Sequence, residues 1–175
     1  FTPTERARAG MSLKFQITSV LPTLTLYDNI LLALQAHCSL FDLVLSRTRK
    51  KLHDQVMTML TQFRLADRAH DAAAALSHGQ QQWLEIAMAL AGKPRLLLLD
   101  EPSEGLAPII VQRIGELLRQ LRGTGATVLI AEQNMHFCLG LASHATVIDK
   151  GQIVYTSSIE ELKANDNIRQ RYLAL

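Results

Sequence analysis

The chain has 175 residues, 48% of them hydrophobic, so it can bury the core of one globular domain and fits neither a disordered protein nor a fibre. Its 18 Lys and Arg against 16 Asp and Glu give a formal charge of +2 without a basic block, so nucleic acid is not an expected partner. The 2 cysteines, Cys38 and Cys138, lack CxxC spacing, which argues against a metal site and a disulfide framework and fits a reducing, cytosolic setting.

The first half of the chain predicts helices. In residues 23–75 the apolar positions recur at helical intervals, as at Val56 and Leu60, and strand-forming runs are scarce. A basic run at residues 47–51 is better explained as the solvated start of a helix than as a phosphate-binding patch. The longest apolar stretch, residues 30–45, is interrupted by polar side chains and falls short of the roughly 20 residues that span a bilayer, so we expect no membrane crossing.

The second half of the chain predicts a parallel α/β sheet. Short apolar runs alternate with one helical stretch, in the order 95–99, 109–121 (helical), 126–131 and 145–149. The four leucines at 96–99 show no polar alternation, which is typical of a strand covered on both faces. Residues 150–151 indicate a tight turn into a further strand at 152–155, and Ser158 followed by Glu161 indicates a capped C-terminal helix.

The run of leucines ends at two adjacent acids, Asp100 and Glu101, which are followed by Pro102. Ligands of open α/β sheets bind at the carboxyl ends of the strands. Adjacent carboxylates in a partly desolvated site both ionise only if a cation or hydrogen-bond donors compensate. Mg²⁺ on a nucleotide would do so, with Asp100 holding the ion and Glu101 orienting or deprotonating the attacking water. The alternative is a strand that ends at an ordinary acidic turn.

Residues 76–80, with the sequence LSHGQ, open onto an amphipathic helix at 81–91. The start of such a helix presents free backbone N–H groups and the positive end of the helix dipole, which together bind phosphate. The simpler alternative is a plain helix start, in which Ser77 caps the helix and Gly79 eases the turn.

The order LSHGQ, amphipathic helix, LLLLDEP resembles the nucleotide-binding domain of the ABC ATPase superfamily. In that family residues 76–80 would be the signature loop, and Asp100 and Glu101 would be the Walker B aspartate and the catalytic glutamate. The resemblance implies an α/β fold in which an incomplete P-loop core of the RecA-like ABC type, with a mainly parallel sheet, carries a helical subdomain. His78 stands where the family most often has glycine, and we interpret it as a variation and not as a metal ligand.

The resemblance covers nearly the whole chain and implies three parts. These are residues 1–22 around the Q-loop, residues 23–92 as a helical subdomain that ends in the signature loop and its helix, and residues 93–175 as the remaining ATPase core with Walker B, the D-loop, the H-loop position and a C-terminal helix. Gln16 would be the Q-loop glutamine, which reaches the magnesium ion while its loop contacts the membrane subunit. The simpler interpretation of Gln16 is the end of a surface strand.

Two positions depart from the commonest family pattern. Ala107, in the sequence SEGLAP, replaces the D-loop aspartate, and Gln133 stands where most members have a histidine. Glutamine can donate a hydrogen bond to a γ-phosphate but cannot take up a proton. Both departures resemble the ATPases of importers for branched-chain amino acids, a group that includes urea-type and amide-type importers.

The chain contains no G-x-x-x-x-G-K-[ST] string, which is the phosphate-binding P-loop. In the family this loop precedes the Q-loop, and the chain begins with Phe1 and not with Met. We therefore expect a fragment of a longer protein, which binds ATP poorly alone and leaves one edge of its sheet unpaired.

For the complete protein the resemblance implies an ATPase that uses ATP and Mg²⁺ and pairs head to tail with a second ATP-binding subunit, as a homo- or heterodimer. It would lie at the cytoplasmic face of the inner or plasma membrane, bound to transmembrane permease subunits, and would drive import of a small solute. The residues around each nucleotide would be Ser77, His78, Gly79 and Gln80 of one subunit, and Gln16, Asp100, Glu101 and Gln133 of the other. Two alternatives stay open: a truncated, non-hydrolytic ABC-like binding or regulatory module, and a soluble ABC ATPase of DNA repair or translation.

Overall fold

The computed structural model describes residues 9–14, 20–36, 48–121 and 125–172, together with the single positions 2, 5, 6, 38, 41 and 43. The chain divides into two compact units, Phe1–Ala131 and Glu132–Leu175, and each is described by itself. The three-part division expected from the sequence, at residues 22 and 92, stays a prediction.

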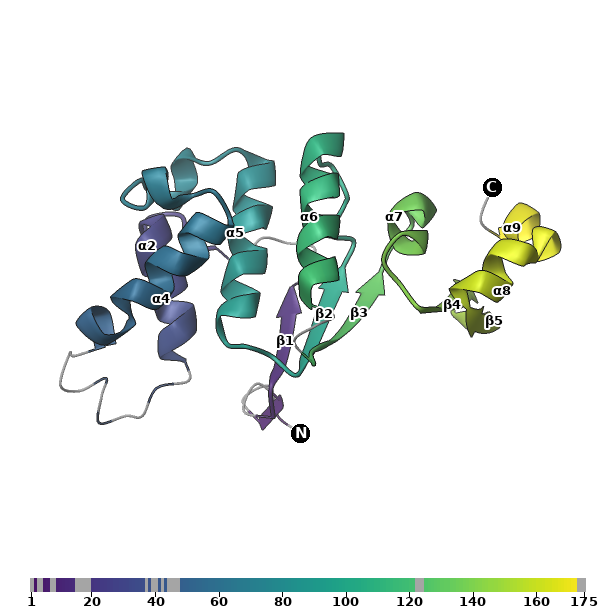
Figure 1. The fold of residues 1–175 in the computed structure, drawn as a ribbon, viewed down its shortest axis with the longest axis horizontal. Coiled ribbons are helices and arrows are strands. Elements are labelled where there is room, and N and C mark those ends of the chain that lie inside the picture. Colours follow the sequence, from purple (N-terminus) through teal and green to yellow (C-terminus); the bar gives the residue numbers. More distant parts are fainter. Residues whose placement is uncertain are drawn as a thin grey trace. The chain divides into compact units, whose positions relative to one another are not determined.

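A three-stranded parallel sheet forms the centre of the first unit (Figure 1). Its strands, in spatial order, are β1 (Met11–Lys14), β2 (Leu96–Asp100) and β3 (Thr127–Ala131). The register places Leu97 of β2 between Ser12 and Val128. The parallel sheet and the strands expected at 95–99 and 126–131 are confirmed. The four residues of β1 are too few to show a periodic pattern, and a strand was expected there only as the simpler interpretation of Gln16.

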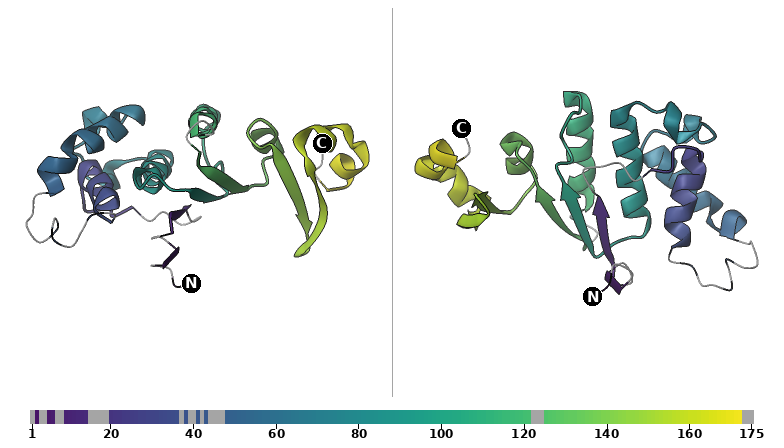
Figure 2. Two further views of the ribbon diagram at one scale, coloured as in Figure 1. Left: turned by 60° about the horizontal axis from the view of Figure 1, so that its bottom comes forward. Right: turned by 180° about the vertical axis from the view of Figure 1, so that it is seen from behind.

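The two faces of this sheet differ in how they are covered. Helices α5 (His78–Ala91) and α6 (Pro108–Leu121) lie on one face, as Figure 2 shows. Leu97 and Leu99 are buried, whereas Leu96 and Leu98 are half-buried and 62% of Leu129 is exposed. Within the described residues of the first unit, helices therefore cover one face of the sheet, and β3 forms one of its edges.

The helical segment expected at 23–75 is confirmed over its described residues. It contains α2 (Leu26–Gln35), α4 (Thr48–Gln62) and the short 3₁₀ turns η1 (Ala66–Arg68) and η2 (Ala73–Ala75), and its helices pack with α5. The aromatic rings of Phe63 and Trp83 meet edge to face with centroids 4.9 Å apart. The Trp83 indole N–H also donates to the Phe63 carbonyl oxygen at 2.6 Å, so this buried N–H has a hydrogen-bond partner within the apolar core.

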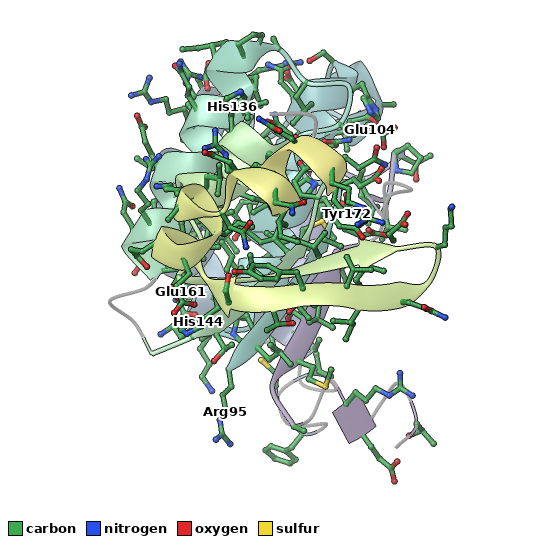
Figure 3. The ribbon with its side chains drawn as sticks, turned by 90° about the vertical axis from the view of Figure 1, so that its right-hand side faces the viewer. Arg95, Glu104, His136, His144, Glu161 and Tyr172 are labelled. Atoms are coloured by element: carbon green, nitrogen blue, oxygen red, sulfur yellow. The ribbon has the colours of Figure 1, made fainter. Side chains whose placement is uncertain are left out.

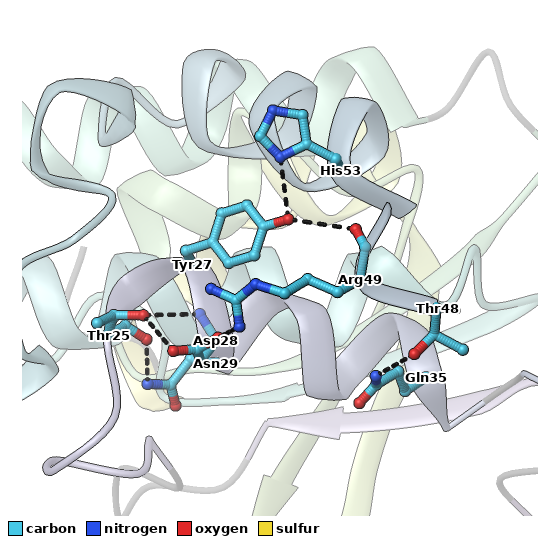
Figure 4. Close-up of polar contacts among 8 residues, drawn as sticks. All are labelled: Thr25, Tyr27, Asp28, Asn29, Gln35, Thr48, Arg49 and His53. Carbon is cyan, nitrogen blue, oxygen red and sulfur yellow. Dashed lines mark hydrogen bonds and ion pairs between the residues drawn. The ribbon is translucent and has the colours of Figure 1, made fainter. Parts of the chain in front are cut away.

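Asn29 fixes the entry of the chain into α2. Its side chain is fully buried, and its Oδ1 accepts a hydrogen bond from the Leu21 amide at 2.9 Å. Its Nδ2 donates to the carbonyl oxygens of Leu21, Leu24 and Thr25 at 3.1, 3.4 and 2.9 Å. Figure 4 shows the contact with Thr25, which is itself the N-cap of α2. The side chain thus supplies the acceptor for the Leu21 amide and adds a second donor to carbonyls that already accept from backbone amides.

Polar contacts tie α2 to α4 (Figure 4). Arg49 pairs with Asp28 at 2.7 Å, and its guanidinium lies 4.8 Å from the centroid of the Tyr27 ring. The Tyr27 hydroxyl lies 3.0 Å from Nδ1 of His53. Part of the basic run at 47–51 thus serves to pack the two helices together, in line with its interpretation as a helix start.

The second unit contains an antiparallel hairpin and three short helices. Its elements are α7 (Met135–Leu139), β4 (His144–Asp149), β5 (Gln152–Ser158), α8 (Ile159–Ala164) and α9 (Asp166–Tyr172). The run expected at 145–149 forms β4, which pairs with β5 across a turn at residues 150–151, so the tight turn between two strands that the sequence predicted is confirmed. Both turn residues have positive φ, 48° and 76°, which is the geometry of a tight hairpin turn.

The small core of the second unit consists of Val147, Ile159 and Leu162, with Tyr172 packed against it. Ser158 and Glu161 form the capping box that the sequence predicted at the start of α8. Figure 3 labels Glu161 and Tyr172. Among the described residues, no helix combines the length and apolar character needed to span a membrane.

Candidate functional site

The loop at residues 76–80 forms the first turn of α5. Ser77 is the N-cap, and its Oγ accepts a hydrogen bond from the Gln80 amide at 3.4 Å while Gln80 Oε1 accepts one from the Ser77 amide at 3.1 Å. The helix therefore begins at His78, earlier than the expected residue 81, because this reciprocal capping box closes its first turn. The box does not use the amides of His78 and Gly79, so the plain cap and a phosphate-binding helix start are compatible readings of this loop.

The side chains of this turn differ in what surrounds them. Ser77 and His78 are exposed, and Nε2 of His78 lies 3.2 Å from Nε2 of the buried Gln82 one turn further on. The Cα atom of Gly79 lies close to Leu106, because a Cβ atom built at this position would be 3.2 Å from Cδ2 of Leu106. The absence of a side chain at Gly79 thus lets the turn lie directly against the segment that follows the acidic pair.

Asp100 and Glu101 end the central strand. Asp100 is the last residue of β2 and is exposed, and Glu101 is half-buried. The Glu101 backbone has a φ of 44°, a left-handed conformation that costs an L-residue about 1 kcal/mol. A hydrogen bond of 2.8 Å from the Glu101 amide to the Ala131 carbonyl oxygen holds this bend against β3.

The loop and the acids lie at the same end of the first unit. All three strands of the sheet are parallel, so their carboxyl ends share one edge, with Asp100 paired to Ala131. Helix α5 runs back along the sheet before β2 begins, and Figure 1 shows its start at that same end. The contact between Gly79 and Leu106 joins the two features, because Leu106 belongs to the turn that follows Glu101.

Two predicted site residues are not part of this described arrangement. Gln16 lies outside the described residues. Gln133 is exposed and belongs to the second unit, where its amide donates to Oε2 of Glu132 at 2.8 Å. The described arrangement therefore consists of Ser77, His78, Gly79, Gln80, Asp100 and Glu101.

A divalent cation would find few protein ligands here. Across the described part of the chain, no three His, Cys, Asp or Glu side chains gather in a metal-binding group. An ion at Asp100 would take most of its ligands from water and phosphate oxygens, which is how Mg²⁺ usually binds. The residues present thus fit Mg²⁺ carried by a nucleotide and do not fit an all-protein metal site.

Comparison with known sequences identifies the family. The sequence model of the family described as "ABC transporter" matches residues 2–104, which include the loop and both acids. The chain belongs to the ABC transporter family. The resemblance that the sequence motifs suggested is confirmed, as is the assignment to its ATP-binding domain.

Several ABC proteins are similar to this chain. It is 48% identical to the high-affinity branched-chain amino acid transport ATP-binding protein BraG of Pseudomonas aeruginosa over 110 residues, which are 63% of this chain and 47% of BraG. It is 36% identical over 171 residues to the lipopolysaccharide export system ATP-binding protein LptB of Acidithiobacillus ferridurans, covering 97% of this chain and 67% of that protein. An uncharacterized ABC transporter ATP-binding protein of Rhizobium meliloti is 36% identical over 168 residues, 96% of this chain and 59% of its own length. The chain thus spans about half the length of BraG and somewhat more of the others.

Solved structures show the same ABC fold. The crystal structure of the ADP conformation of an ATP-binding cassette of an ABC transporter superposes with a TM-score of 0.78 at 24% identity, covering 99% of this chain and 72% of that chain. A nucleotide-free ATP-binding cassette gives a TM-score of 0.73 at 25% identity, covering 95% and 69%. The predicted fold class, an α/β ABC core with a helical part, is confirmed.

Sequence reasoning missed two features of the site. The spacing S-x-x-Q at Ser77 and Gln80 is a capping-box signal, so the early start of α5 could have been read from the sequence. The contact of Gly79 with Leu106 joins residues far apart along the chain, and no local pattern announces it.

Proposed function

We propose that this chain is part of an ATP-binding and ATP-hydrolysing subunit of an ABC importer. The observation that carries the proposal is the meeting of the 76–80 turn with the segment after Glu101 at the carboxyl end of the parallel sheet. A helix start that can bind phosphate and a pair of carboxylates at the carboxyl ends of the strands support nucleotide hydrolysis, and their contact would link the nucleotide sites of two paired subunits.

Each subunit would act on two nucleotides. Asp100 would hold Mg²⁺ through water on the subunit's own nucleotide, and Glu101 would orient or deprotonate the water that attacks the γ-phosphate. Gln16 would contact the same ion, and Gln133 would donate a hydrogen bond to the γ-phosphate. The turn at residues 77–80, in which Ser77 and His78 are exposed, would contact the nucleotide held by a second ATP-binding subunit.

Glu101 is suited to this role by its backbone. The left-handed bend lies where the strand gives way to a turn, and the hydrogen bond to Ala131 anchors it to the sheet. A strained residue held by its surroundings is typical of functional sites, because the strain fixes one orientation of the side chain. Magnesium, when bound, would supply charge neutralisation for the phosphate oxygens.

The proposed cargo is a branched-chain amino acid or a related amide or urea. The identity to BraG, 48% over 110 residues, is the highest among the relatives described above. The sequences around Ala107 and Gln133, which depart from the common family pattern, also resemble this group of importers. The similarity to LptB covers more of the chain at 36% identity, so an export system is the competing assignment.

The proposed assembly is a dimer of ATP-binding subunits on the cytoplasmic side of the membrane, attached to transmembrane permease subunits. The closing of the dimer on ATP would bring the 76–80 turn onto the partner's nucleotide, and hydrolysis would reopen it. The competing hypothesis, a non-hydrolytic ABC-like module, makes the same contacts but has no turnover.

The test uses the complete subunit that carries these residues, including the reading frame upstream of Phe1. Glu101→Gln is expected to lower steady-state ATP hydrolysis by about 100-fold or more while nucleotide binding is retained. Glu104→Gln, the same chemical change in the same turn, is the control. Unchanged turnover in Glu101→Gln would contradict the role proposed for Glu101. Absence of turnover in the parent subunit, or an upstream frame that encodes no glycine-lysine loop, would favour the non-hydrolytic module.

Uptake assays separate the two cargo assignments. Cells that lack the gene are expected to take up labelled leucine, urea or a short amide more slowly, and the complete subunit is expected to restore the uptake. Normal uptake of all three together with a defect in surface lipopolysaccharide would favour export.

A further inference from the structure

Arg68 links three parts of the helical segment around the 76–80 turn. It ends η1, and 29% of its side chain is exposed. Its Nε donates to Oδ2 of Asp71 at 2.7 Å, its Nη2 to the Ala75 carbonyl oxygen at 3.2 Å and its Nη1 to Oε1 of Gln80 at 3.2 Å. Three acceptors therefore fix the planar guanidinium next to the Gln80 side-chain amide, which closes the capping box.

The side-chain amide oxygen of Gln80 has three hydrogen-bond donors around it, which is more than its two lone pairs can accept from. Besides Arg68, it accepts from the Ser77 amide at 3.1 Å and from the Ser77 hydroxyl at 3.2 Å. An amide oxygen has two lone pairs, and a charged donor binds more strongly than a neutral one. Arg68 and the Ser77 amide are thus sufficient for Gln80 Oε1, and the Ser77 hydroxyl is the donor that can leave without cost.

A hydroxyl has a single proton to donate. While that proton points to Gln80, the exposed Ser77 offers an approaching phosphate only lone pairs, which repel it. If the proton turns outward, the Gln80 oxygen keeps two partners as long as Arg68 is present. Without Arg68 the same rotation would leave one lone pair of the half-buried Gln80 to a neutral donor such as water, which binds it less strongly than the guanidinium, and this opposes the release.

We propose that Arg68 is a positioning residue that frees the Ser77 hydroxyl to donate to a γ-phosphate oxygen of the nucleotide on the second subunit. This proposal rests on the proposed function, because Arg68 would position the 76–80 turn that the proposed function places on the nucleotide. Asp71 fixes the guanidinium, and its own backbone is tied to the start of α2 by the hydrogen bond from the Leu26 amide at 3.1 Å. Arg68 itself contacts neither nucleotide nor magnesium in this role.

The test measures ATP-dependent dimerisation of the complete subunit in a Glu101→Gln background, where bound ATP is not consumed. Arg68→Ala is expected to weaken dimerisation roughly tenfold, as the loss of one charge-assisted hydrogen bond would, while ATP binding to the monomer is unchanged. Arg68→Lys keeps the charge but cannot contact all three acceptors at once, so its dimerisation is expected to be weaker than that of the parent and stronger than that of Arg68→Ala.

Arg169→Ala is the matched control. Arg169 also pairs with a carboxylate three residues away, Asp166 at 3.1 Å, and with a backbone carbonyl, that of Lys163 at 3.1 Å, but it lies in the second unit and outside the 76–80 turn. It is expected to leave dimerisation unchanged. Equal dimerisation of Arg68→Ala and Arg169→Ala would overturn the proposal, whatever their stabilities.

A second pair of variants asks whether Arg68 acts through Gln80. Gln80→Glu keeps the acceptor for Ser77 but makes it a stronger one, so Arg68→Ala is expected to weaken dimerisation more in this background than in the parent. An equal effect in both backgrounds would overturn the proposal. If Glu101→Gln with Arg68 intact does not dimerise on ATP, the proposed function itself fails, which is distinguishable from a failure of Arg68 alone.

Discussion

The amide nitrogen of Glu101 donates a hydrogen bond of 2.8 Å to the carbonyl oxygen of Ala131, and Glu101 has a φ of 44° at the same point. The bond joins the end of β2 to the end of β3, so the sheet holds the left-handed bend in place. A glycine would adopt this φ without strain. The glutamate at this position is therefore retained at a cost in stability, as expected of a residue kept for its chemistry.

We predict that Glu101→Gly is more stable than Glu101→Ala by about 1 kcal/mol, because both remove the carboxylate but only glycine relieves the left-handed strain. Urea unfolding monitored by circular dichroism measures the difference. The same pair at the exposed Glu116, inside α6, is the control, and there glycine should be less stable than alanine by about 1 kcal/mol. If the order at Glu101 matches the order at Glu116, the bend is not strained.

Gly79→Ala is predicted to destabilise the protein by about 1 kcal/mol, because its methyl group would lie 3.2 Å from Cδ2 of Leu106 in an already packed contact. In a Leu106→Ala background the crowding disappears, and alanine at 79 should then stabilise the helix, since it is a better helix former than glycine. Thermal unfolding of the four proteins of this cycle gives the coupling. Additive effects of the two substitutions would show that residue 79 does not press on Leu106.

Asn29→Leu is predicted to cost about 3 kcal/mol of unfolding free energy, because it leaves the Leu21 amide without its acceptor and removes the hydrogen bonds that Nδ2 donates to the carbonyl oxygens of Leu21 and Thr25. The control is Asn134→Ala, which removes a helix cap that accepts from the Phe137 amide and should cost about 1 kcal/mol. Chemical denaturation measures both. A cost for Asn29→Leu no larger than that of the cap would mean that water replaces the lost partners.

The sequence predicted those parts of the fold that local patterns govern. The leucine run gave β2 to within one residue, and Ser158 with Glu161 gave the start of α8, because strand composition and capping are properties of a few neighbouring residues. The break between α8 and α9 at Asn165 was not anticipated, since the polar residues there continue an amphipathic pattern.

The pairing of strands was harder to predict than their existence. The alternation of runs suggested that 145–149 joins the parallel sheet with β2 and β3, whereas the turn signal at 150–151 suggested a hairpin with 152–155; the pairing observed is the hairpin with β5. Apolar runs of similar length do not encode their partners, and a tight turn at Lys150 makes the local antiparallel pairing accessible. At the site, the motifs located Ser77 and Glu101. The roles of these residues stay predictions, because the spacing of motifs along the sequence does not give the distances between atoms in space.

Cys138 gives a prediction that depends on pH. Burial raises the pKa of its thiol from 9.0 to about 11, with a smaller contribution from the negative charge of Glu132. At pH 8 the thiol is therefore protonated and should react slowly with iodoacetamide, since the thiolate is the nucleophile. In a Cys38→Ser background, so that Cys138 is the single thiol, the alkylation rate should rise with a midpoint near pH 11.

The same shift makes stability fall with alkali. Between pH 9.0 and about 11 the unfolded chain loses the Cys138 proton before the folded protein does, so unfolding releases a proton and the free energy of unfolding falls as pH rises through this window. The contribution is constant below the window. Glu132→Gln, which keeps an acceptor for the amides of Gln133 and Asn134, should move the alkylation midpoint down only part of the way, because burial is the larger cause. A midpoint at or below 9.0 in the parent would show that the thiol is open to water.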